Sequence, residues 1–494
     1  MNKREILNEV SFGKRIAEEE IAELSSYFVE TDQWKRIYYG EVDIVYGPKG
    51  SGKSAIYFLL INKQAELEKK GIITIAAENP RGTPVFKDIA SDPPTTEIEF
   101  CNLWKLYLAT LIGYYLRQNG NPDAKELVSV LEKAGLLTRE RNLRGMLQSV
   151  VEYVRYRRSV ESIEGGMQLD PTTGTPMGFT GKITLREPSS KLKGLGYISI
   201  DNLLESINTI LSQSETSIWL LIDRLDVAFA DSLELEQNAL RALFKVYLDI
   251  INLERISLKV FLRSDIWNRI TDSGFREASH ITRGVTIQWD EPSLLNLVVR
   301  RILKNEVIKD YLNVTEEEVL SDYKKQEELF YRIFPDQVDP SDKQPSTFTW
   351  MLSRTADGSD YTAPRELIHL LSATREEQLR KLELGNTEPL RELLFEGSSI
   401  KKALLEVSKV RVEQTLYSEY PSVRPYLAKL DRRKTEQSVK SLAIIWGIGE
   451  DDALTIATEL VNIGVFKKRS KHRGFTLWVP FLFRSGLNMI QGSE

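Results

Sequence analysis

An eight-residue glycine-rich segment constrains this chain more than any other part of its sequence. It consists of Gly47, Pro48, Lys49, Gly50, Ser51, Gly52, Lys53 and Ser54. These residues match the pattern G-x-x-x-x-G-K-[ST] in full. The apolar run EVDIVYG (41–47) predicts a buried strand before the segment, and SAIYFLLINKQAELEKKG (54–71) predicts a helix after it. A chance glycine-rich turn is the alternative, but the strand-to-helix context favours a phosphate-binding loop.

Each residue type in this loop has a chemical role. Glycines let the backbone wrap closely around phosphates with its N–H groups pointing inward, and the dipole of the following helix adds positive potential. Lys53 is expected to reach the β- and γ-phosphates, and the Ser54 hydroxyl is expected to ligate Mg²⁺. The loop therefore predicts a site for a nucleoside triphosphate with Mg²⁺.

Two carboxylates follow a second apolar strand. The run SIWLLID (217–223) is uniformly apolar up to Asp223, as expected of a parallel strand covered on both faces. A carboxylate at the end of a neighbouring strand is needed to hold Mg²⁺ through water, and Asp223 fits that role. Asp226 is the candidate for orienting the attacking water, because Arg224 stands where many such ATPases use a glutamate. Alternatively, Asp223 only ends the strand and Asp226 only begins the next turn.

Strand and helix patterns alternate over residues 1–289. Further strands are expected at 73–77, 258–262 and 285–289, and helices at 14–28, 199–213, 233–251 and 265–272. Five strands with helical crossovers predict a doubly wound α/β domain with a parallel sheet. An insertion at about 100–216 carries long helical patterns, and its segment 165–185 predicts a β-hairpin or exposed loop. Such an insertion is where a partner or effector would bind.

Composition narrows the class of protein. The net charge of −5 over 494 residues excludes a uniformly basic nucleic-acid binder. Cys101 is the only cysteine, so no intramolecular disulfide can form, and three scattered histidines disfavour a zinc site. The chain contains no run of about 18 apolar residues and no signal-peptide pattern at its start. The expectation is a soluble protein of the reducing cytoplasm, without membrane contact.

The remaining chain predicts two further domains. Residues 290–418 show mostly helical sequence patterns. In the C-terminal part, 419–494, TEQSVKSLAIIW (435–446) and DDALTIATELVNI (451–463) predict two helices. The segment VFKKRSKHRGFTLWVPFLF then predicts a strand, a basic turn and a second strand. Helix, helix and two-stranded ribbon is the layout of a winged helix.

A basic cluster marks the expected tip of this wing. It consists of Lys467, Lys468, Arg469, Lys471 and Arg473. Such a wing is suited to contacting DNA phosphates with salt-dependent, sequence-independent affinity. A solvated hairpin tip, or a domain that gates the nucleotide site, is the alternative. The expected recognition helix opens with three acidic residues (450–452), which argues against reading of base edges.

Three segments together suggest a family. GPKGSGKS, LLIDRLD and FLRSDIW, in this order, resemble the AAA+/STAND branch of P-loop ATPases, most of all a bacterial group related to origin-recognition proteins. FGKRIAEEE and YFVETDQW, which precede the loop, resemble that group's N-terminal signature. The resemblance is weak between residues 105 and 215. It implies ATP as the nucleotide, residues 290–418 as a helical lid, and a winged helix after the lid.

The resemblance also implies roles for arginines. Arg263, at the end of strand 258–262, would be the sensor-1 residue that contacts the γ-phosphate; pairing with Asp265 is the alternative. Arg365, in YTAPREL, would be the sensor-2 residue of the lid, although a proline followed by arginine is also a good helix start. Arg276 or Arg283 would supply a finger in trans if the protein forms homo-oligomers.

The leading hypothesis is an ATP-hydrolysing regulatory switch. By resemblance, such ATPases often act as oligomers with protein effectors in bacterial antiphage or mobile-element systems. The first alternative is a DNA-binding ATPase that contacts duplex through the wing. A P-loop kinase is a weaker alternative, because no separate acceptor pocket with its own base is identifiable.

Overall fold

The structure is a computed structural model that describes residues 2–21, 23–77, 96–137, 143–162, 182–194, 196–225, 232–471 and 474–493. By their internal contacts the residues divide into two compact units. One, named here the sheet unit, comprises Asp32–Gly47 and Lys53–Ile287. The other, named the helical unit, comprises Met1–Thr31, Pro48–Gly52 and Gln288–Glu494. Residues 1–31 thus group with 288–494, whereas the three-domain division at 289 and 418 stays a prediction.

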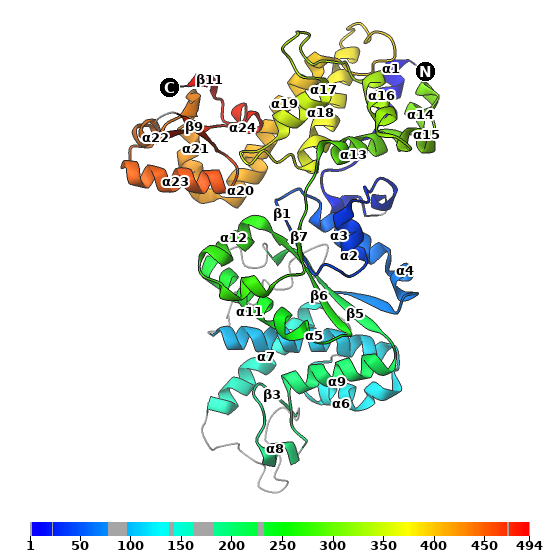
Figure 1. The fold of residues 1–494 in the computed structure, drawn as a ribbon, viewed down its shortest axis with the longest axis vertical. Helices are drawn as coiled ribbons and strands as arrows, with labels where there is room; N and C mark the ends of the chain where they lie inside the picture. The colour runs from blue at the N-terminus through cyan, green and yellow to red at the C-terminus, as the bar shows by residue number, and fades with distance from the viewer. Residues whose placement is uncertain are drawn as a thin grey trace. The chain divides into compact units, whose positions relative to one another are not determined.

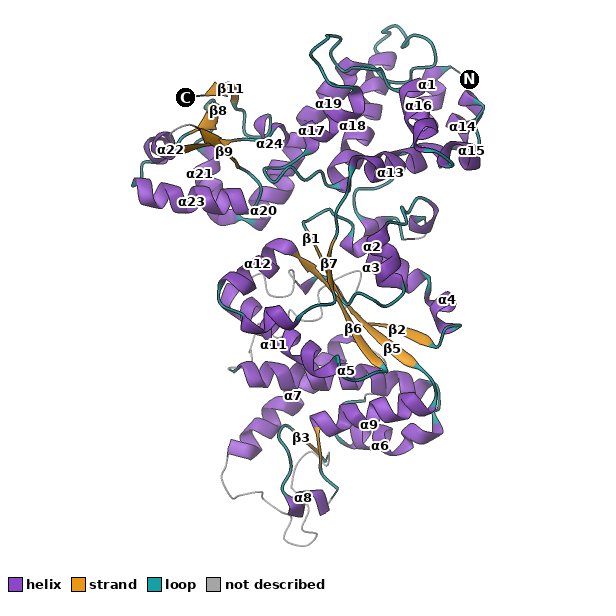
Figure 2. Ribbon diagram, in the orientation of Figure 1, coloured by secondary structure: helices purple, strands orange, loops and turns teal. Residues whose placement is uncertain are grey.

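A parallel sheet forms the centre of the sheet unit (Figure 2). Its strands are β1 (Ile44–Gly47), β2 (Ile72–Ala76), β5 (Ser217–Ile222), β6 (Ile256–Arg263) and β7 (Gly284–Thr286). Their order is β2-β5-β6-β1-β7, and every neighbouring pair is parallel. Because all strands run the same way, their carboxyl ends meet at one edge, where α/β sheets bind ligands. The predicted α/β fold class with a parallel sheet is confirmed.

The sheet unit also contains helices, some of which pack directly on the sheet. They are α2 (Asp32–Tyr38), α3 (Lys53–Asn62), α4 (Gln64–Glu68), α5 (Glu97–Gln118), α6 (Lys125–Lys133), α7 (Leu143–Ser162), α8 (Ser190–Gly194), α9 (Ile200–Gln213), α11 (Leu233–Ile250) and α12 (Ser264–Asp272), with the short turns η4 (Pro122–Ala124) and η5 (Arg276–His280). Helix α3 packs on β1, β2 and β6, and α11 and α12 pack on β6. Figure 1 shows α3 on one side of these strands and α11 and α12 on the other.

The predicted insertion is an integral part of the core. Helix α5 is buried along most of its length and packs against α7, α9 and α11. The Trp104 indole N–H donates to the Ala239 carbonyl at 2.9 Å, and the Tyr107 hydroxyl donates to the Ala77 carbonyl at 2.7 Å. Most of the segment predicted as a hairpin, 165–185, lies outside the described residues. Its described end, β3 (Ile183–Thr184), pairs in parallel with β4 (Ile198–Ser199), so this pairing is not that of a hairpin.

The helical unit is built around a second hydrophobic core. Its first helices are α1 (Lys3–Glu9), α13 (Glu291–Leu303), α14 (Glu306–Leu312), α15 (Glu316–Leu320), α16 (Tyr323–Ile333), α17 (Thr347–Thr355), α18 (Pro364–Glu383) and α19 (Gly397–Val410). A π-helical segment, η6 (Arg411–Leu416), continues α19 and leads into α20 (Tyr417–Glu419). The predicted helical character of residues 290–418 is therefore confirmed.

The C-terminal part carries a small sheet beside short helices. The strands are β8 (Lys434–Gln437), β9 (Lys467–Lys471), β10 (Gly474–Trp478) and β11 (Ile490–Ser493), in the order β11-β8-β10-β9. The helices are α21 (Arg424–Ala428), α22 (Val439–Trp446), α23 (Glu450–Asn462) and α24 (Phe481–Arg484), preceded by the turn η7 (Pro421–Val423). The predicted helix at 451–463 is present as α23, and the two strands predicted on either side of the basic turn are present as β9 and β10.

The predicted helix at 435–446 begins four residues too early. Residues 435–437 belong to β8, which pairs with β10 and β11. Ser438 then caps α22, because its side chain accepts a hydrogen bond from the Ser441 backbone N–H. Pairing with two strands distant in sequence outweighs the local helical pattern of this segment.

The predicted helix at 14–28 is also wrong. The described part of this segment contains only the short turns η1 (Ala17–Glu19) and η2 (Leu24–Ser26). Glu20 is buried and forms an ion pair with Arg301 of α13 at 3.0 Å, and the Arg301 guanidinium stacks over the Tyr27 ring at 4.2 Å. A buried carboxylate must be paired. This long-range ion pair therefore sets the local backbone in place of the helical spacing.

Candidate functional site

The phosphate-binding loop joins β1 to α3, as predicted. Gly47 is the last residue of β1 and Lys53 the first of α3. Gly50 and Gly52 have φ values of 84° and 102°, in the left-handed region that favours glycine. The Lys53 ammonium donates to the Gly47 carbonyl at 2.8 Å, so the side chain lies across the loop from its helix to its strand.

Ser54 and Asp223 meet at the carboxyl edge of the sheet. The Ser54 hydroxyl donates to Asp223 Oδ2 at 2.8 Å, and Asp223 is a buried residue directly after β5. Hydroxyl and carboxylate oxygens are the hard ligands that Mg²⁺ prefers. Arg224, the next residue, has a φ of 60°, an uncommon left-handed conformation for a non-glycine residue that clusters at functional sites. The residues present therefore fit a magnesium ion held between Ser54 and Asp223.

Arg263 lies beside the loop strand. It is the last residue of β6 and pairs in register with Gly47 of β1. Its guanidinium donates to both oxygens of Asp265, from Nε at 3.0 Å and from a terminal nitrogen at 2.8 Å. Both predicted features coexist: a position at the carboxyl edge and a pairing with Asp265. The other predicted catalytic carboxylate, Asp226, lies outside the described residues.

The tip of the loop, residues 48–52, belongs to the helical unit and contacts other side chains of that unit. Lys49 forms an ion pair with Glu419 at the end of α20. The Trp289 indole N–H donates to the Ser51 carbonyl at 2.8 Å. A Cβ atom added to Gly50 would lie 3.0 Å from the Cβ of Arg365, so Arg365 packs directly against the loop backbone.

The sequence predicts a role in the site for Arg365 but not for Trp289 or Glu419. The only local signal for Trp289 was its place at the end of the VTIQW run, and Glu419 carries no motif. Both residues act through contacts between segments that are far apart in the chain. Neither hydrophobic periodicity nor motif spacing can predict contacts of this kind.

The two candidate finger arginines differ in their surroundings. Arg283 forms an ion pair with the buried Asp43 at 2.8 Å, at the amino end of β1. Arg276, in η5, is exposed. A role for either arginine as a finger in trans stays a prediction.

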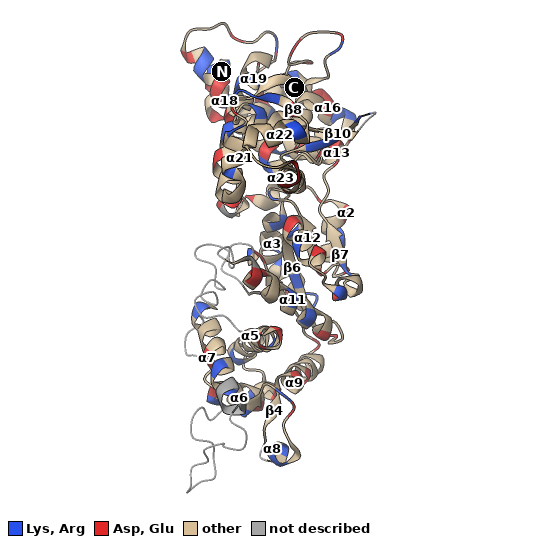
Figure 3. Cartoon of the chain, turned by 90° about the vertical axis from the view of Figure 1, so that its left-hand side faces the viewer, with Lys and Arg blue, Asp and Glu red and all other residues tan. Residues whose placement is uncertain are grey.

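Ion pairs within the chain partly neutralise the basic segment of the C-terminal sheet. Figure 3 colours Lys and Arg blue and Asp and Glu red along the chain, and it labels β8 and β10 of this sheet. Lys467 forms an ion pair with Asp360 at 2.5 Å, and Lys471 forms one with Glu436 at 2.7 Å. The Lys468 ammonium lies 4.1 Å from the Phe475 ring centroid. Arg469 stacks on Trp478, and Arg473 lies outside the described residues. The predicted cluster is thus less free to meet DNA than its sequence indicates.

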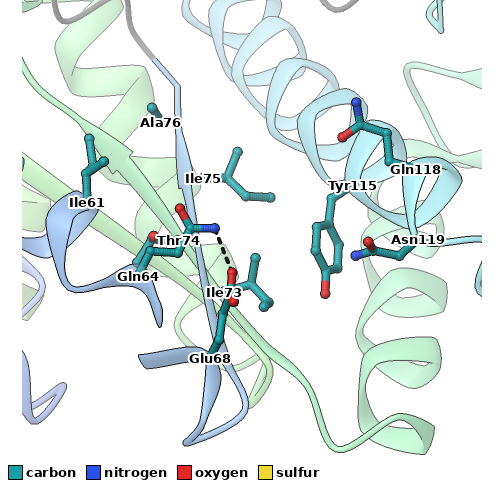
Figure 4. Close-up of a pocket in the computed structure, with 10 residues that line it drawn as sticks. All are labelled: Ile61, Gln64, Glu68, Ile73, Thr74, Ile75, Ala76, Tyr115, Gln118 and Asn119. Carbon is teal, nitrogen blue, oxygen red and sulfur yellow. Dashed lines mark hydrogen bonds between the residues drawn. The ribbon is translucent and has the colours of Figure 1, made fainter. Parts of the chain in front are cut away.

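A cavity of about 590 Å³ lies at the other end of α3 from the loop (Figure 4). Its lining residues are Ile61, Gln64, Glu68, Ile73, Thr74, Ile75, Ala76, Tyr115, Gln118 and Asn119. Gln64 donates to Glu68 at 2.7 Å at its rim. None of the residues predicted to bind nucleotide lines this cavity, so it is separate from the candidate site.

The parallel sheet, the loop between β1 and α3, and the Ser54–Asp223 contact define a P-loop nucleotide-binding fold. Among the helices that the structure describes, none is long and apolar enough to cross a membrane.

Comparisons with known proteins find only distant likeness. No family model and no curated protein matches the chain. The ORC1 protein of Aeropyrum pernix, solved in complex with DNA, is 14% identical over 99% of this chain and 96% of that chain, with a TM-score of 0.35. A Walker-type ATPase of Pyrococcus abyssi is 12% identical over 93% of this chain and 95% of that chain, with a TM-score of 0.38. The ORC2 protein of Aeropyrum pernix in ADPNP–ADP complexes is 13% identical over 98% of this chain and 96% of that chain, with a TM-score of 0.41.

Proposed function

We propose that this protein is an ATP-binding and ATP-hydrolysing regulatory switch. The hydrogen bond of 2.8 Å between the Ser54 hydroxyl and Asp223 carries the proposal. It joins the last residue of the glycine-rich loop to a buried carboxylate at a strand end, which is the pair that a P-loop site uses for its metal ion. Bound Mg²⁺ would neutralise the charge that develops on the β- and γ-phosphates.

The chain's own residues supply the remaining chemistry in this proposal. The Lys53 ammonium leaves the Gly47 carbonyl and binds the β- and γ-phosphates. Arg263, at the carboxyl end of β6, stabilises negative charge on the γ-phosphate. Asp226 orients the attacking water, and Asp223, together with Ser54, would hold the metal ion.

Regulation would come from the contacts of the loop tip. Lys49, Ser51 and Gly50 already touch Glu419, Trp289 and Arg365 of the helical unit. A γ-phosphate bound at the loop would add a contact to Arg365 that ADP lacks. ATP and ADP would therefore stabilise different placements of the lid, 290–418, and of the C-terminal part, proposed to be a winged helix. Arg276 or Arg283 would act in trans if the switch assembles into AAA+/STAND-like homo-oligomers. A protein effector and an antiphage role follow from the family resemblance alone.

The first test removes the lysine of the loop. Lys53→Ala should weaken binding of a fluorescent ATP analogue at least about 10-fold and abolish phosphate release, because removing one charged phosphate contact costs more than about 1.4 kcal/mol. Lys69→Ala, at an exposed position after α4, removes an equal charge and should leave both unchanged. Equal nucleotide affinity in the two variants would contradict the proposed site.

A second variant separates hydrolysis from binding. Asp226→Asn should retain ATP binding but slow hydrolysis by about 10²–10⁴-fold, the range for a lost general base. ATP should then remain trapped after rapid gel filtration. Unchanged turnover would remove Asp226 from this role and leave the Ser54–Asp223 site intact.

Binding of duplex DNA through the wing is a second candidate function. It is favoured by the exposure of Lys468, Arg469 and Lys471 on β9, and weakened by the ion pairs of Lys467 and Lys471. Filter binding at two salt concentrations tests it. The triple variant Lys467, Lys468 and Arg469→Ala should lose binding and flatten its salt dependence. Binding that is unchanged by these substitutions would reject the wing as the contact surface.

A further inference from the structure

Three arginines and two aromatic rings alternate in a row within the helical unit. Arg354 comes from α17, Arg484 from α24 and Arg469 from β9, and the rings are those of Phe481 and Trp478. The Arg354 guanidinium carbon lies 3.5 Å from the Phe481 centroid, and that of Arg484 lies 3.9 Å from it. Arg484 also lies 4.7 Å from the Trp478 centroid, and Arg469 lies 3.9 Å from it. These five residues are named here the arginine ladder.

The side chains of the ladder are packed against one another in the folded protein. Two guanidinium carbons this close to one centroid cannot share one face of the ring, so Arg354 and Arg484 enclose Phe481 between them. The Trp478 and Phe481 rings meet edge to face at 5.5 Å. Arg484 is only 9% exposed, and its Nε is fixed by the Val479 carbonyl at 2.9 Å. Packing therefore holds the central guanidinium in place before any ligand arrives.

The positive charge of the ladder is balanced only in part: hydrogen bonds from Lys471 and Thr476, and after them the charge of Arg469, lower the pKa of Glu436. Among the residues that the structure describes, no carboxylate lies within 4.0 Å of the guanidinium nitrogens of Arg354, Arg469 or Arg484. The neighbouring Glu436 is held by Lys471 and by the Thr476 hydroxyl, each at 2.7 Å.

Two arginines of the ladder, Arg354 and Arg484, have lowered pKa values. Burial, with the charges of Arg354 and Arg469, lowers the pKa of Arg484 to about 10, and burial lowers the pKa of Arg354. The Arg484 side chain therefore remains charged at neutral pH. The mutual repulsion of the three arginines is a cost that a bound anion would relieve.

We propose that the arginine ladder is a binding site for the phosphate groups of a polyphosphate or polynucleotide ligand. Guanidinium groups bind phosphate oxygens in a bidentate fork, and they are less strongly hydrated than ammonium groups. Three cations spread along a row match several linked phosphates better than a single carboxylate. Because the arginines cover the aromatic faces, the rings are not available for base stacking, so recognition is independent of sequence. Arg354 and Arg484 lie outside the basic segment 467–473.

The test uses the full-length chain and two probes. A fluorescein-labelled 30-nucleotide oligonucleotide is titrated by anisotropy. Inorganic triphosphate is titrated by calorimetry in proteins that also carry Lys53→Ala, which removes the contribution of the phosphate-binding loop. Arg354→Gln should weaken binding of the active probe at least 10-fold, and Arg354→Lys should restore part of the affinity. Arg433→Gln, at an exposed position in the same C-terminal part, removes the same charge and should have no effect.

The outcomes assign the source of the phosphate or reject the site. Arg354-dependent binding of the oligonucleotide alone identifies a polynucleotide backbone, and Arg354-dependent binding of triphosphate identifies a free polyphosphate. Absence of binding of both probes at low salt would overturn the proposal. So would equal affinities of Arg354→Gln and Arg433→Gln, provided that their thermal unfolding curves match. ATP binding at Lys53 is measured separately, so failure here leaves the proposed switch untouched.

Discussion

A single buried carboxylate, Asp43, organises the amino end of the strand that leads to the loop. The Lys259 ammonium donates to it at 2.8 Å, Arg283 pairs with it at 2.8 Å, and the Tyr247 hydroxyl donates to it at 3.2 Å. Lys259 is 1% exposed, and burial lowers the pKa of its ammonium. These contacts join β1, β6, α11 and the start of β7. The loop follows the carboxyl end of β1, and Arg263 lies at the carboxyl end of β6, whereas Asp43 precedes the amino end of β1. The Asp43 network therefore helps to fix the register in which β1 and β6 pair.

At this residue scale, Asp43→Ala should destabilise the protein strongly. The substitution leaves the Lys259 ammonium buried without its carboxylate, a change that costs about 3–5 kcal/mol. Urea unfolding followed by tryptophan fluorescence measures the loss. Glu41→Ala removes an exposed carboxylate two residues away and should cost less than about 1 kcal/mol. Similar unfolding midpoints for the two variants would show that Lys259 does not depend on Asp43.

At the scale of elements, α20 and the loop tip meet through one ion pair. Glu419 ends α20, which follows the π-helical segment η6, and irregular helical turns of this kind often mark functional sites. Glu419 holds the ammonium of Lys49 beside the residues that would bind phosphates. A nucleotide phosphate and Glu419 would therefore compete for the same cation.

Glu419→Gln should accordingly tighten ATP binding. The released Lys49 becomes available to phosphate, and a partly exposed ion pair is worth about 0.5–1 kcal/mol, which corresponds to roughly two- to five-fold in affinity. Titration with a fluorescent ATP analogue measures the change. Glu413→Gln alters an exposed glutamate in η6 and serves as the control. Unchanged or weaker binding in Glu419→Gln would mean that the pair does not oppose nucleotide.

On the scale of the whole molecule, residues near the start of the chain pack with residues far along it. Arg375 of α18 donates to the Leu7 carbonyl at 2.8 Å, and Lys3 donates to the Pro389 carbonyl at 2.5 Å. Arg15 lies 3.5 Å from His369. Burial, reinforced by the charge of Arg15, lowers the pKa of His369 to about 4. The imidazole is therefore neutral in the folded protein at neutral pH.

This shift makes the stability of the helical unit depend on pH. The unfolded histidine has a pKa of about 6.5, so between about pH 6.5 and 4 the unfolded state binds the proton that the folded state excludes. Stability from this group is present above pH 6.5 and is lost as the pH falls, by about 2 kcal/mol at pH 5. Urea unfolding at about pH 5 and pH 7.5 tests this. His369→Gln should reduce the difference, whereas His280→Gln, at an exposed position, should not.

Local chemistry made much of this protein predictable from its sequence. The loop from Gly47 to Ser54 was recognisable because left-handed glycines and a strand-to-helix context are local demands. The five strands were recognisable because a buried parallel strand needs a continuous apolar run. The contact between Ser54 and Asp223 was an expectation that the structure meets at 2.8 Å.

Only the tertiary structure decided how distant segments combine. It placed β6 between β1 and β5, it set residues 435–437 in a strand, and it replaced the expected helix at 14–28 by a segment held through Glu20 and Arg301. It also brought Glu419 to the loop tip. Periodicity and spacing report the preferences of neighbours in the chain. Buried ion pairs such as Glu20–Arg301, and strand pairing such as that of β8 with β10, join residues that are far apart in the chain, and their energies exceed those local preferences.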